Sequence, residues 1–175
     1  ERVFFVNSGA EANENALRVA LRATSRTKIV AVEGAFHGRT AAAAAVTAGH
    51  AAWYGFPREP FEVAFVPFGD GLALQEAVDA GTAAVIVEPV QGVAGARDLP
   101  PAFLERVRAV TSARGALLIF DEVQCGMGRT GWPFAAQAYG VVPDLLTTAK
   151  GLAGGFPAGA LFMTAALAAT VGKNE

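Results

Sequence analysis

The chain has 175 residues, which is the size of one domain or of part of one. Hydrophobic residues make up 53% of it and charged residues only 17%, which excludes an intrinsically disordered protein. A formal net charge of −2 excludes the strongly basic surface of a typical nucleic-acid-binding protein. One cysteine allows no internal disulfide, and with only two histidines it argues against a zinc site. Nothing points to secretion, so we expect a cytoplasmic protein.

Short apolar runs alternate with helical patterns along the chain. In chain order we predict a strand at 2–6, a helix at 11–23, a strand at 28–32, a helix at 40–48, a strand at 63–66, a helix at 72–80, a strand at 83–87, a helix at 101–113, and strands at 116–120 and 145–149. The strands are continuous apolar runs, which is typical of strands with both faces covered. This pattern predicts an α/β fold with a mostly parallel sheet and helices on both faces.

Residues 151–172 carry no charge and are numerous enough to cross a bilayer. The run contains five glycines, and Pro157 lies near its start, so its first half is a poor helix. We therefore predict a loop, a short strand at 158–163 and a small alanine-rich helix in place of a membrane span.

Polar residues follow five of the predicted strands. They are Asn7 and Ser8, the stretch from Glu33 to Arg39, Glu88, Asp121 with Glu122, and Lys150. Ligands of open α/β sheets bind outside the carboxyl ends of the strands. The sequence therefore predicts a site for a charged, phosphorylated ligand at one edge of the sheet.

The first helix begins with a pattern that suits an anion. Ser8 can cap the helix and Glu11 lies three residues later, which is a capping box. The backbone N–H groups of Gly9 and Ala10 would then face a phosphate at the helix N-terminus. An ordinary helix cap explains the same residues equally well.

Asp121 and Lys150 are the two strongest candidates for chemistry. A carboxylate at the end of so apolar a strand needs a positive partner, either on a ligand or on an arginine in a salt bridge. Lys150, one of three lysines, lies between an apolar strand and a glycine-rich loop. A lysine in an apolar pocket loses its proton readily and can form a Schiff base, whereas a surface lysine is the structural alternative.

Three other polar residues give weaker signals. A lone histidine in a loop, such as His37, is more often held by hydrogen bonds than catalytic. Arg39 could bind a carboxylate through its guanidinium fork, or could be a solvated arginine. Cys125 has no basic partner nearby and is not expected to be a nucleophile.

Together these groups fit a phosphorylated ligand that needs a lysine amine, a carboxylate and an aromatic face. Pyridoxal 5′-phosphate (PLP) has these demands, since its aldehyde takes a lysine and its ring nitrogen takes a carboxylate. With these groups, the chain resembles the class III aminotransferases, which are PLP enzymes of fold type I, and among them the acetylornithine aminotransferases. The matching motifs are Asn7-Ser8-Gly9-Ala10-Glu11-Ala12-Asn13, Gly34-Ala35-Phe36-His37-Gly38-Arg39-Thr40, Glu88-Pro89-Val90-Gln91-Gly92, the run from Asp121 to Gly131, and Ala149-Lys150-Gly151-Leu152-Ala153-Gly154-Gly155.

The resemblance implies a role for each matching residue. Lys150 would bind the cofactor aldehyde and move the substrate proton, and Asp121 would pair with the ring nitrogen. Arg39 would bind the substrate carboxylate. The remaining cofactor contacts would come from backbone N–H groups of Gly9 and Ala10 on the phosphate, from Phe36 and Val123 on the two ring faces, from Gln124 on the phenolic oxygen, and from Glu122 in the same motif.

The resemblance also implies what surrounds these residues. Residues 1–175 would be the central part of the PLP-binding large domain, with an N-terminal segment and a C-terminal small domain outside it. The protein would be a homodimer with shared active sites. Val93 stands where the family usually has a glutamate that helps one site alternate between the amino donor and the acceptor. Substrate preference is therefore open.

The function implied is transfer of the terminal amino group of N-acetylornithine to 2-oxoglutarate, in arginine biosynthesis. Ornithine, succinylornithine, 4-aminobutyrate, diaminobutyrate and a lysine-pathway donor are alternatives. A non-catalytic binding protein that keeps the fold is an alternative of another class, disfavoured because Lys150 and Asp121 are both present. A dinucleotide enzyme is set aside because the first strand is not followed by G-x-G-x-x-G.

Overall fold

The computed structural model describes residues 2–172, and strands and helices alternate along most of that range. The strands are β1 (Arg2–Val6), β2 (Lys28–Val32), β3 (Glu62–Val66), β4 (Thr82–Val87), β5 (Val90–Gln91), β6 (Arg97–Asp98), β7 (Leu117–Asp121), β8 (Leu145–Thr148) and β9 (Gly159–Met163). The helices are α1 (Gly9–Thr24), α2 (Ala41–Ala45), α3 (Gly71–Ala77), α4 (Pro101–Arg114), α5 (Ala135–Tyr139) and α6 (Ala165–Ala168), with a 3₁₀ turn, η1, at His50–Ala52.

Within the described range, seven strands form one sheet in the order β1-β9-β8-β7-β4-β2-β3. The neighbouring strands β3, β2, β4, β7 and β8 pair in parallel, and β9 runs antiparallel to both of its neighbours. Every strand of this sheet except β9 therefore points its carboxyl end to the same edge. This arrangement confirms the predicted α/β fold with a mostly parallel sheet.

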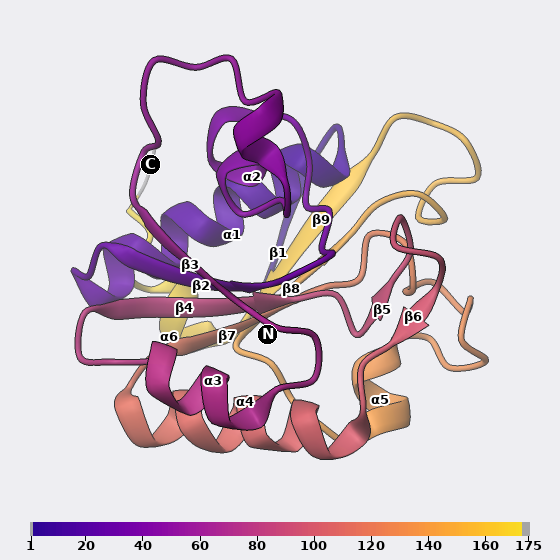
Figure 1. Ribbon diagram of the computed structural model, residues 1–175. Helices are drawn as coiled ribbons and strands as arrows, with labels where there is room; N and C mark the ends of the chain where they lie inside the picture. The colour runs from indigo at the N-terminus through magenta and orange to yellow at the C-terminus, as the bar shows by residue number, and fades with distance from the viewer. Residues whose placement is uncertain (1, 173–175) are drawn as a thin grey trace.

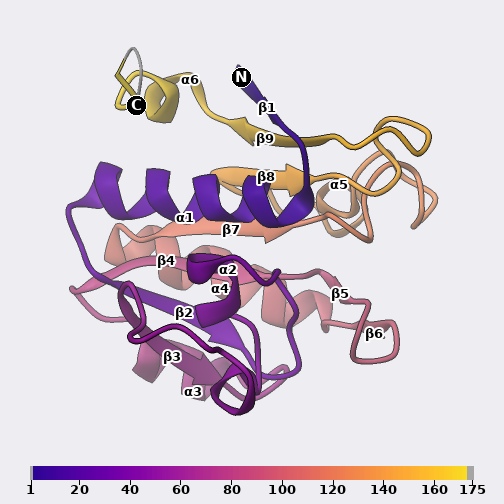
Figure 2. The ribbon, with the colours of Figure 1, turned by 90° about the horizontal axis from the view of Figure 1, so that it is seen from above.

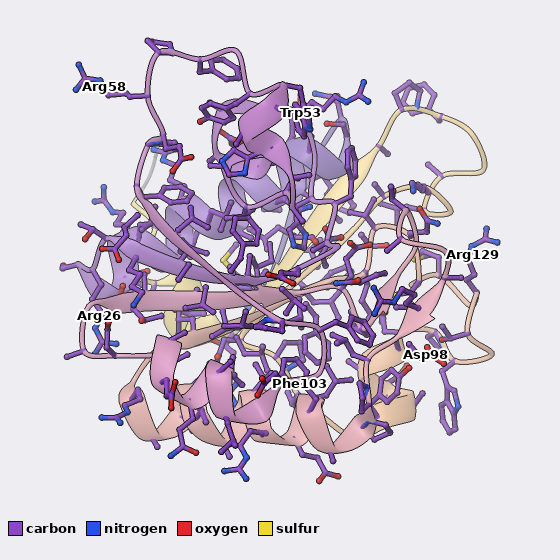
Figure 3. All side chains as sticks on the ribbon, viewed as in Figure 1. Arg26, Trp53, Arg58, Asp98, Phe103 and Arg129 are labelled. Atoms are coloured by element: carbon purple, nitrogen blue, oxygen red, sulfur yellow. The ribbon has the colours of Figure 1, made fainter. Side chains whose placement is uncertain are left out.

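The two faces of the sheet are covered by different helices. Figure 1 shows α3, α4 and α5 below the sheet and α1 and α2 above it, and Figure 2 shows α1 lying along the strands. Successive side chains of a strand point to opposite faces. Val30 accordingly packs in one core with Phe103 of α4, labelled in Figure 3, whereas Ile29 packs in the other with Leu17 of α1. Both cores bury continuous apolar strands, as the sequence pattern predicts.

Local sequence explains where the longer helices begin and end. Proline occupies the first position of α4, where its fixed φ suits a helix and no N–H is needed. Gly115 ends the same helix with φ 64°, a left-handed conformation that glycine adopts without strain. In α1 the side chain of Ser8 accepts a hydrogen bond from the backbone N–H of Glu11 at 3.1 Å. The predicted Ser8 cap is confirmed, but the capping box is not complete, because Oε2 of Glu11 accepts from the backbone N–H of Asn7 at 2.6 Å instead of that of Ser8.

Several short elements escape prediction. The hairpin of β5 and β6 has two residues per strand, too few for any period to show. The helix predicted at 40–48 is shorter, because α2 ends at Ala45 and Gly49 adopts φ 71° before η1. Residues 151–172 form a turn region followed by β9 and α6, and no helix within the described chain is long and apolar enough to span a membrane.

Candidate functional site

A cavity of about 420 Å³ opens at the edge where the carboxyl ends of the strands meet. Its walls come from the start of α1, the loop after β2, the ends of β4 and β7, and the turn after β8. Most residues predicted for the site line it, namely Gly9, Ala10, Phe36, Arg39, Asp121, Val123, Gln124 and Lys150. The structure thus brings together residues that lie up to about 140 positions apart in sequence.

The N-terminus of α1 forms one wall of the cavity. A Cβ atom on Gly9 would lie 2.6 Å from Cγ1 of Val123, so only glycine lets the helix start approach this side chain so closely. Both residues line the cavity. The backbone N–H groups of Gly9 and Ala10 belong to the first turn of α1, whose N–H groups have no partner within the helix. This wall can therefore bind an anion.

Asp121 is held by a buried hydrogen-bond network. Its Oδ2 atom accepts from Nδ2 of Asn13 at 2.7 Å and lies 2.7 Å from Nδ1 of His37, while Oδ1 accepts from the backbone N–H of Val123 at 3.0 Å. Asn13 also donates to the carbonyl of His37 at 2.8 Å and accepts from the hydroxyl of Thr147 at 2.6 Å. These contacts fix the carboxylate at the cavity wall.

The partner of Asp121 is therefore a histidine and an amide, and the arginine salt bridge considered from the sequence is absent in the described range. His37 is 2% exposed, and its Nε2 atom has no hydrogen-bond partner among the described residues. His37 is thus held by hydrogen bonds, as expected for a loop histidine, but it holds the most buried acid of the cavity wall.

Glu88 brings a second buried carboxylate to the cavity. It accepts from the backbone N–H of Phe36 at 2.7 Å and from that of Gly92 at 3.3 Å. Burial raises the pKa of Glu88, and the nearby carboxylate of Asp121 raises it further. Glu88 therefore anchors the loop that carries Phe36 and Arg39.

Lys150 lies at the rim of the cavity and is exposed, which differs from the apolar pocket expected for it. It is the first residue of the turn region after β8, and it faces the open cavity instead of the core. Its Nζ atom donates to Oε1 of Gln124. A Cβ atom on Gly92 would overlap the Gln124 amide, so this glycine makes room for the pair.

The loop from Phe36 to Arg39 separates the cavity from a second pocket. Phe36, Arg39 and Val93 line both spaces, and Trp53 lines the second. Figure 3 shows Trp53 beside α2. Arg39 is the one charged residue in the described lining of that second pocket. A ligand there meets a cation and apolar surfaces.

Glu122 does not reach the cavity. It is fully buried, and its carboxylate accepts from the backbone N–H groups of Ala135 and Ala136 at 2.6 and 2.8 Å. It therefore caps the N-terminus of α5, although burial raises its pKa. Burial also raises the pKa of the Cys125 thiol to about 12, which keeps it protonated. Neither residue is placed to act on a ligand in the cavity.

The sequence places Glu88 at this edge without a specific role, assigns none to Asn13, and gives only a weak signal for His37. Each carried a signal. Asn13 lies one helical turn after Gly9 on α1, so the two share the face that meets the cavity. Glu88 is a charged residue directly after a wholly buried strand. Both are 4% exposed or less, and a buried polar side chain needs a partner.

Known proteins resemble this chain in both sequence and fold. The family model described as "Aminotransferase class-III" matches residues 1–175. An acetylornithine aminotransferase of Mycolicibacterium smegmatis is 53% identical over 91% of this chain and 40% of its own length. An acetylornithine/succinyldiaminopimelate aminotransferase of Yersinia pestis is 46% identical over 99% of this chain and 45% of its own.

The fold comparison agrees. The ornithine aminotransferase of Toxoplasma gondii, described with partial occupancy of PLP at its active site, superposes with a TM-score of 0.92 at 31% identity. The match covers 99% of this chain and 43% of that one. The chain thus spans less than half the length of these relatives. Lys150, Asp121 and the N-terminus of α1 line one cavity, and the family match over residues 1–175 shows that this chain belongs to the class III aminotransferases.

Proposed function

We propose that the full-length protein transfers the terminal amino group of N-acetylornithine, or of a similar ω-amino donor, to 2-oxoglutarate in arginine biosynthesis. The observation that carries the proposal is that Lys150 and Asp121 line one cavity at the N-terminus of α1. Class III aminotransferases are PLP-dependent. Residues 1–175 are then the central part of the PLP-binding domain, in a cytoplasmic homodimer whose subunits share active sites.

The residues of the cavity fit PLP. The wall formed by Gly9 and Ala10 offers N–H groups to the phosphate, and the approach of Gly9 to Val123 leaves no room for a side chain there. Asp121 offers a carboxylate already fixed by three donors, of which two are side chains. Phe36 and Val123 would cover the ring, and Gln124 would meet its phenolic oxygen.

When bound, PLP supplies an aldehyde that takes up the amino group and a ring that withdraws electrons. Lys150 would supply the amine for the aldehyde and would then carry the proton of the donor. Its contact with Gln124 orients that amine toward the cavity. Asp121 would keep the ring nitrogen protonated, and its contacts with Asn13 and His37 hold the carboxylate in place.

Arg39 is the residue that we assign to the carboxylate of the substrate, through its guanidinium fork. The second pocket that it lines contains Trp53 and Val93 and, in its described lining, no carboxylate. A free α-ammonium group would lack an anionic partner there, whereas a neutral acyl group would pack on the apolar side chains. This supports an N-acylated donor over ornithine.

The role of Lys150 is tested by Lys150→Ala in the full-length protein. We expect loss of covalently bound cofactor and a fall in turnover of at least several thousandfold. Lys28→Ala is the matched control, because Lys28 pairs with Asp79 at 2.7 Å where β2 begins, away from the cavity. Turnover that survives Lys150→Ala contradicts the assignment.

The donor is tested by the visible spectrum of the full-length protein reconstituted with PLP. We expect N-acetylornithine to bleach the band of the lysine-bound cofactor, while ornithine and 4-aminobutyrate added in parallel leave it unchanged. A yellow protein that ignores all three keeps the cofactor proposal but rejects these donors. Val93 would then be the first position to vary.

A further inference from the structure

Glu14 of α1 ties that helix to the start of α2. Its Oε2 atom accepts from the hydroxyl of Thr40 at 2.5 Å and from the backbone N–H groups of Ala42 and Ala43, both at 3.1 Å. Its Oε1 atom accepts from the N–H of Ala42 at 3.2 Å. One carboxylate on a different element therefore serves three donors of this segment.

The hydroxyl of Thr40 does not act as an ordinary helix cap. Thr40 occupies the position before α2, where a hydroxyl ordinarily accepts a hydrogen bond from the helix N–H groups. Here it accepts none, and it donates to Glu14 instead. Glu14 thus takes over the capping of α2 from outside, and it holds the hydroxyl of Thr40 as well.

The contacts of Glu14 with Thr40, Ala42 and Ala43 form a clamp on one side of Arg39, and a tight contact at Gly38 lies on the other side. A Cβ atom on Gly38 would lie 2.9 Å from Cβ of Ala10 and 3.0 Å from Cβ of Ala43, so Gly38 is wedged between α1 and α2. The next residue but one, Thr40, is held by Glu14. The backbone of Arg39 is therefore fixed on both sides, although its side chain is exposed.

The aromatic end of the same loop is held by other groups. Glu88 accepts from the backbone N–H of Phe36 at 2.7 Å, and the hydroxyl of Thr47 accepts from that of His37 at 2.9 Å. Loss of the Glu14 clamp would therefore free Arg39 and leave Phe36 in place.

We propose that Glu14 is a positioning residue that sets Arg39 for the substrate carboxylate, because its carboxylate fixes Thr40 and the start of α2. The proposal rests on the role of Arg39 in the proposed function. Two properties of the loop from Phe36 to Arg39 then depend on different residues. Glu14 controls the affinity for carboxylates, and Glu88 and Thr47 hold the segment against the cofactor.

The test is Glu14→Gln in the full-length protein, with Glu105→Gln on the exposed face of α4 as the matched control. A glutamine can accept with only one atom, so the clamp loses an acceptor for its donors. We expect the KM for N-acetylornithine to rise about tenfold while kcat and PLP affinity change less than about twofold. Thr40→Val should give a smaller rise of the same kind, and Thr40→Ser should restore the wild-type value.

Two measurements do not depend on turnover. Hydrogen exchange at the amides of Ala42 and Ala43 should accelerate in Glu14→Gln and not in the control. The dissociation constant of glutarate, an unreactive dicarboxylate, should rise about tenfold when titrated calorimetrically into the cofactor-free protein. Arg39→Gln should weaken glutarate equally, and the double variant should show no further loss, because Glu14 acts through Arg39.

The outcomes separate the proposals. Faster exchange with an unchanged KM and an unchanged glutarate affinity overturns the role of Glu14. A loss of PLP affinity as large as the loss of glutarate affinity also overturns it, and so does a double variant whose loss is the sum of the two single losses. If Arg39→Gln alone changes nothing, the assignment of Arg39 is at fault and the inference fails with it. A wild-type protein that transaminates none of the donors rejects the proposed function, while the exchange and glutarate experiments still decide the clamp.

Discussion

Asn13 should be among the most costly side chains to remove near the cavity. It is 1% exposed, and Asn13→Ala deletes two hydrogen bonds donated by its amide and one accepted by it. Asp121 then loses one of its donors, and the carbonyl of His37 and the hydroxyl of Thr147 lose a partner in a buried place. A hydrogen bond to a charged group is worth about 1.5–3 kcal/mol, and each buried orphan costs about 1–3 kcal/mol.

Water entering from the adjoining cavity would recover part of this loss. We therefore expect the free energy of unfolding to fall by about 3–5 kcal/mol, which is a large share of a typical total of about 5–15 kcal/mol. Alanine is a better helix former than asparagine by up to about 0.7 kcal/mol, and this gain applies equally at any interior position of α1.

Asn15→Ala is the control that isolates the network. Asn15 lies on the same helix, and within residues 2–172 its amide donates only to the carbonyl of Glu11, at 2.8 Å in α1. Its replacement should change the free energy of unfolding by less than about 1 kcal/mol. The assay is equilibrium urea denaturation of the full-length protein without cofactor, since bound cofactor would add its own stabilisation. Equal shifts of the two midpoints would refute the importance of the network.

Three other outcomes are expected. Gly9→Ala should lower PLP affinity at least about tenfold, because its Cβ would lie 2.6 Å from Cγ1 of Val123, and the double variant with Val123→Ala should bind no worse than Val123→Ala alone in an absorbance titration. Asp121→Asn should retain cofactor while turnover falls at least about a hundredfold, and unchanged turnover would show that another group holds the ring protonated. Burial raises the thiol pKa of Cys125 to about 12, so little thiolate is present at pH 8. In urea the pKa returns to an ordinary value, and we expect the folded protein to react with iodoacetamide about a thousandfold more slowly than the unfolded one. Similar alkylation rates, followed by mass spectrometry, would contradict this burial.

The regular part of the fold could be predicted because burial leaves a local trace. β2, β4 and β7 are continuous apolar runs, and each matches its predicted position to within about a residue or two. The direction of β9 left no such trace, since an apolar strand reads alike in either orientation. The two-residue strands β5 and β6 are stabilised by pairing with each other, so no periodicity marks them.

The candidate site could be predicted where residues follow strands, and less well where the partner is remote. Asp121 and Lys150 were found because topology alone sends strand ends to one edge. The hydrogen-bond partners of the buried carboxylates could not be predicted from strand order. Asp121 is tied to Asn13 across 108 residues, whereas Glu122, the next residue, turns away to cap α5. Adjacent residues at a strand end point in opposite directions, and the sequence does not say which one the cavity receives.

One helix sets the register of the whole site. α1 presents Gly9 and Ala10 to the cavity, Asn13 to Asp121, and Glu14 to the loop of Arg39. These contacts lie within two turns of one rigid element, whose residues are separated by about 100°. Insertion of a single residue between Gly9 and Asn13 would rotate the network away from the cavity wall of Gly9 and Ala10 by that angle. The proposed anion-binding N-terminus, the buried carboxylate of Asp121 and the proposed substrate arginine are therefore aligned by one local structure, although their own sequence separations are large.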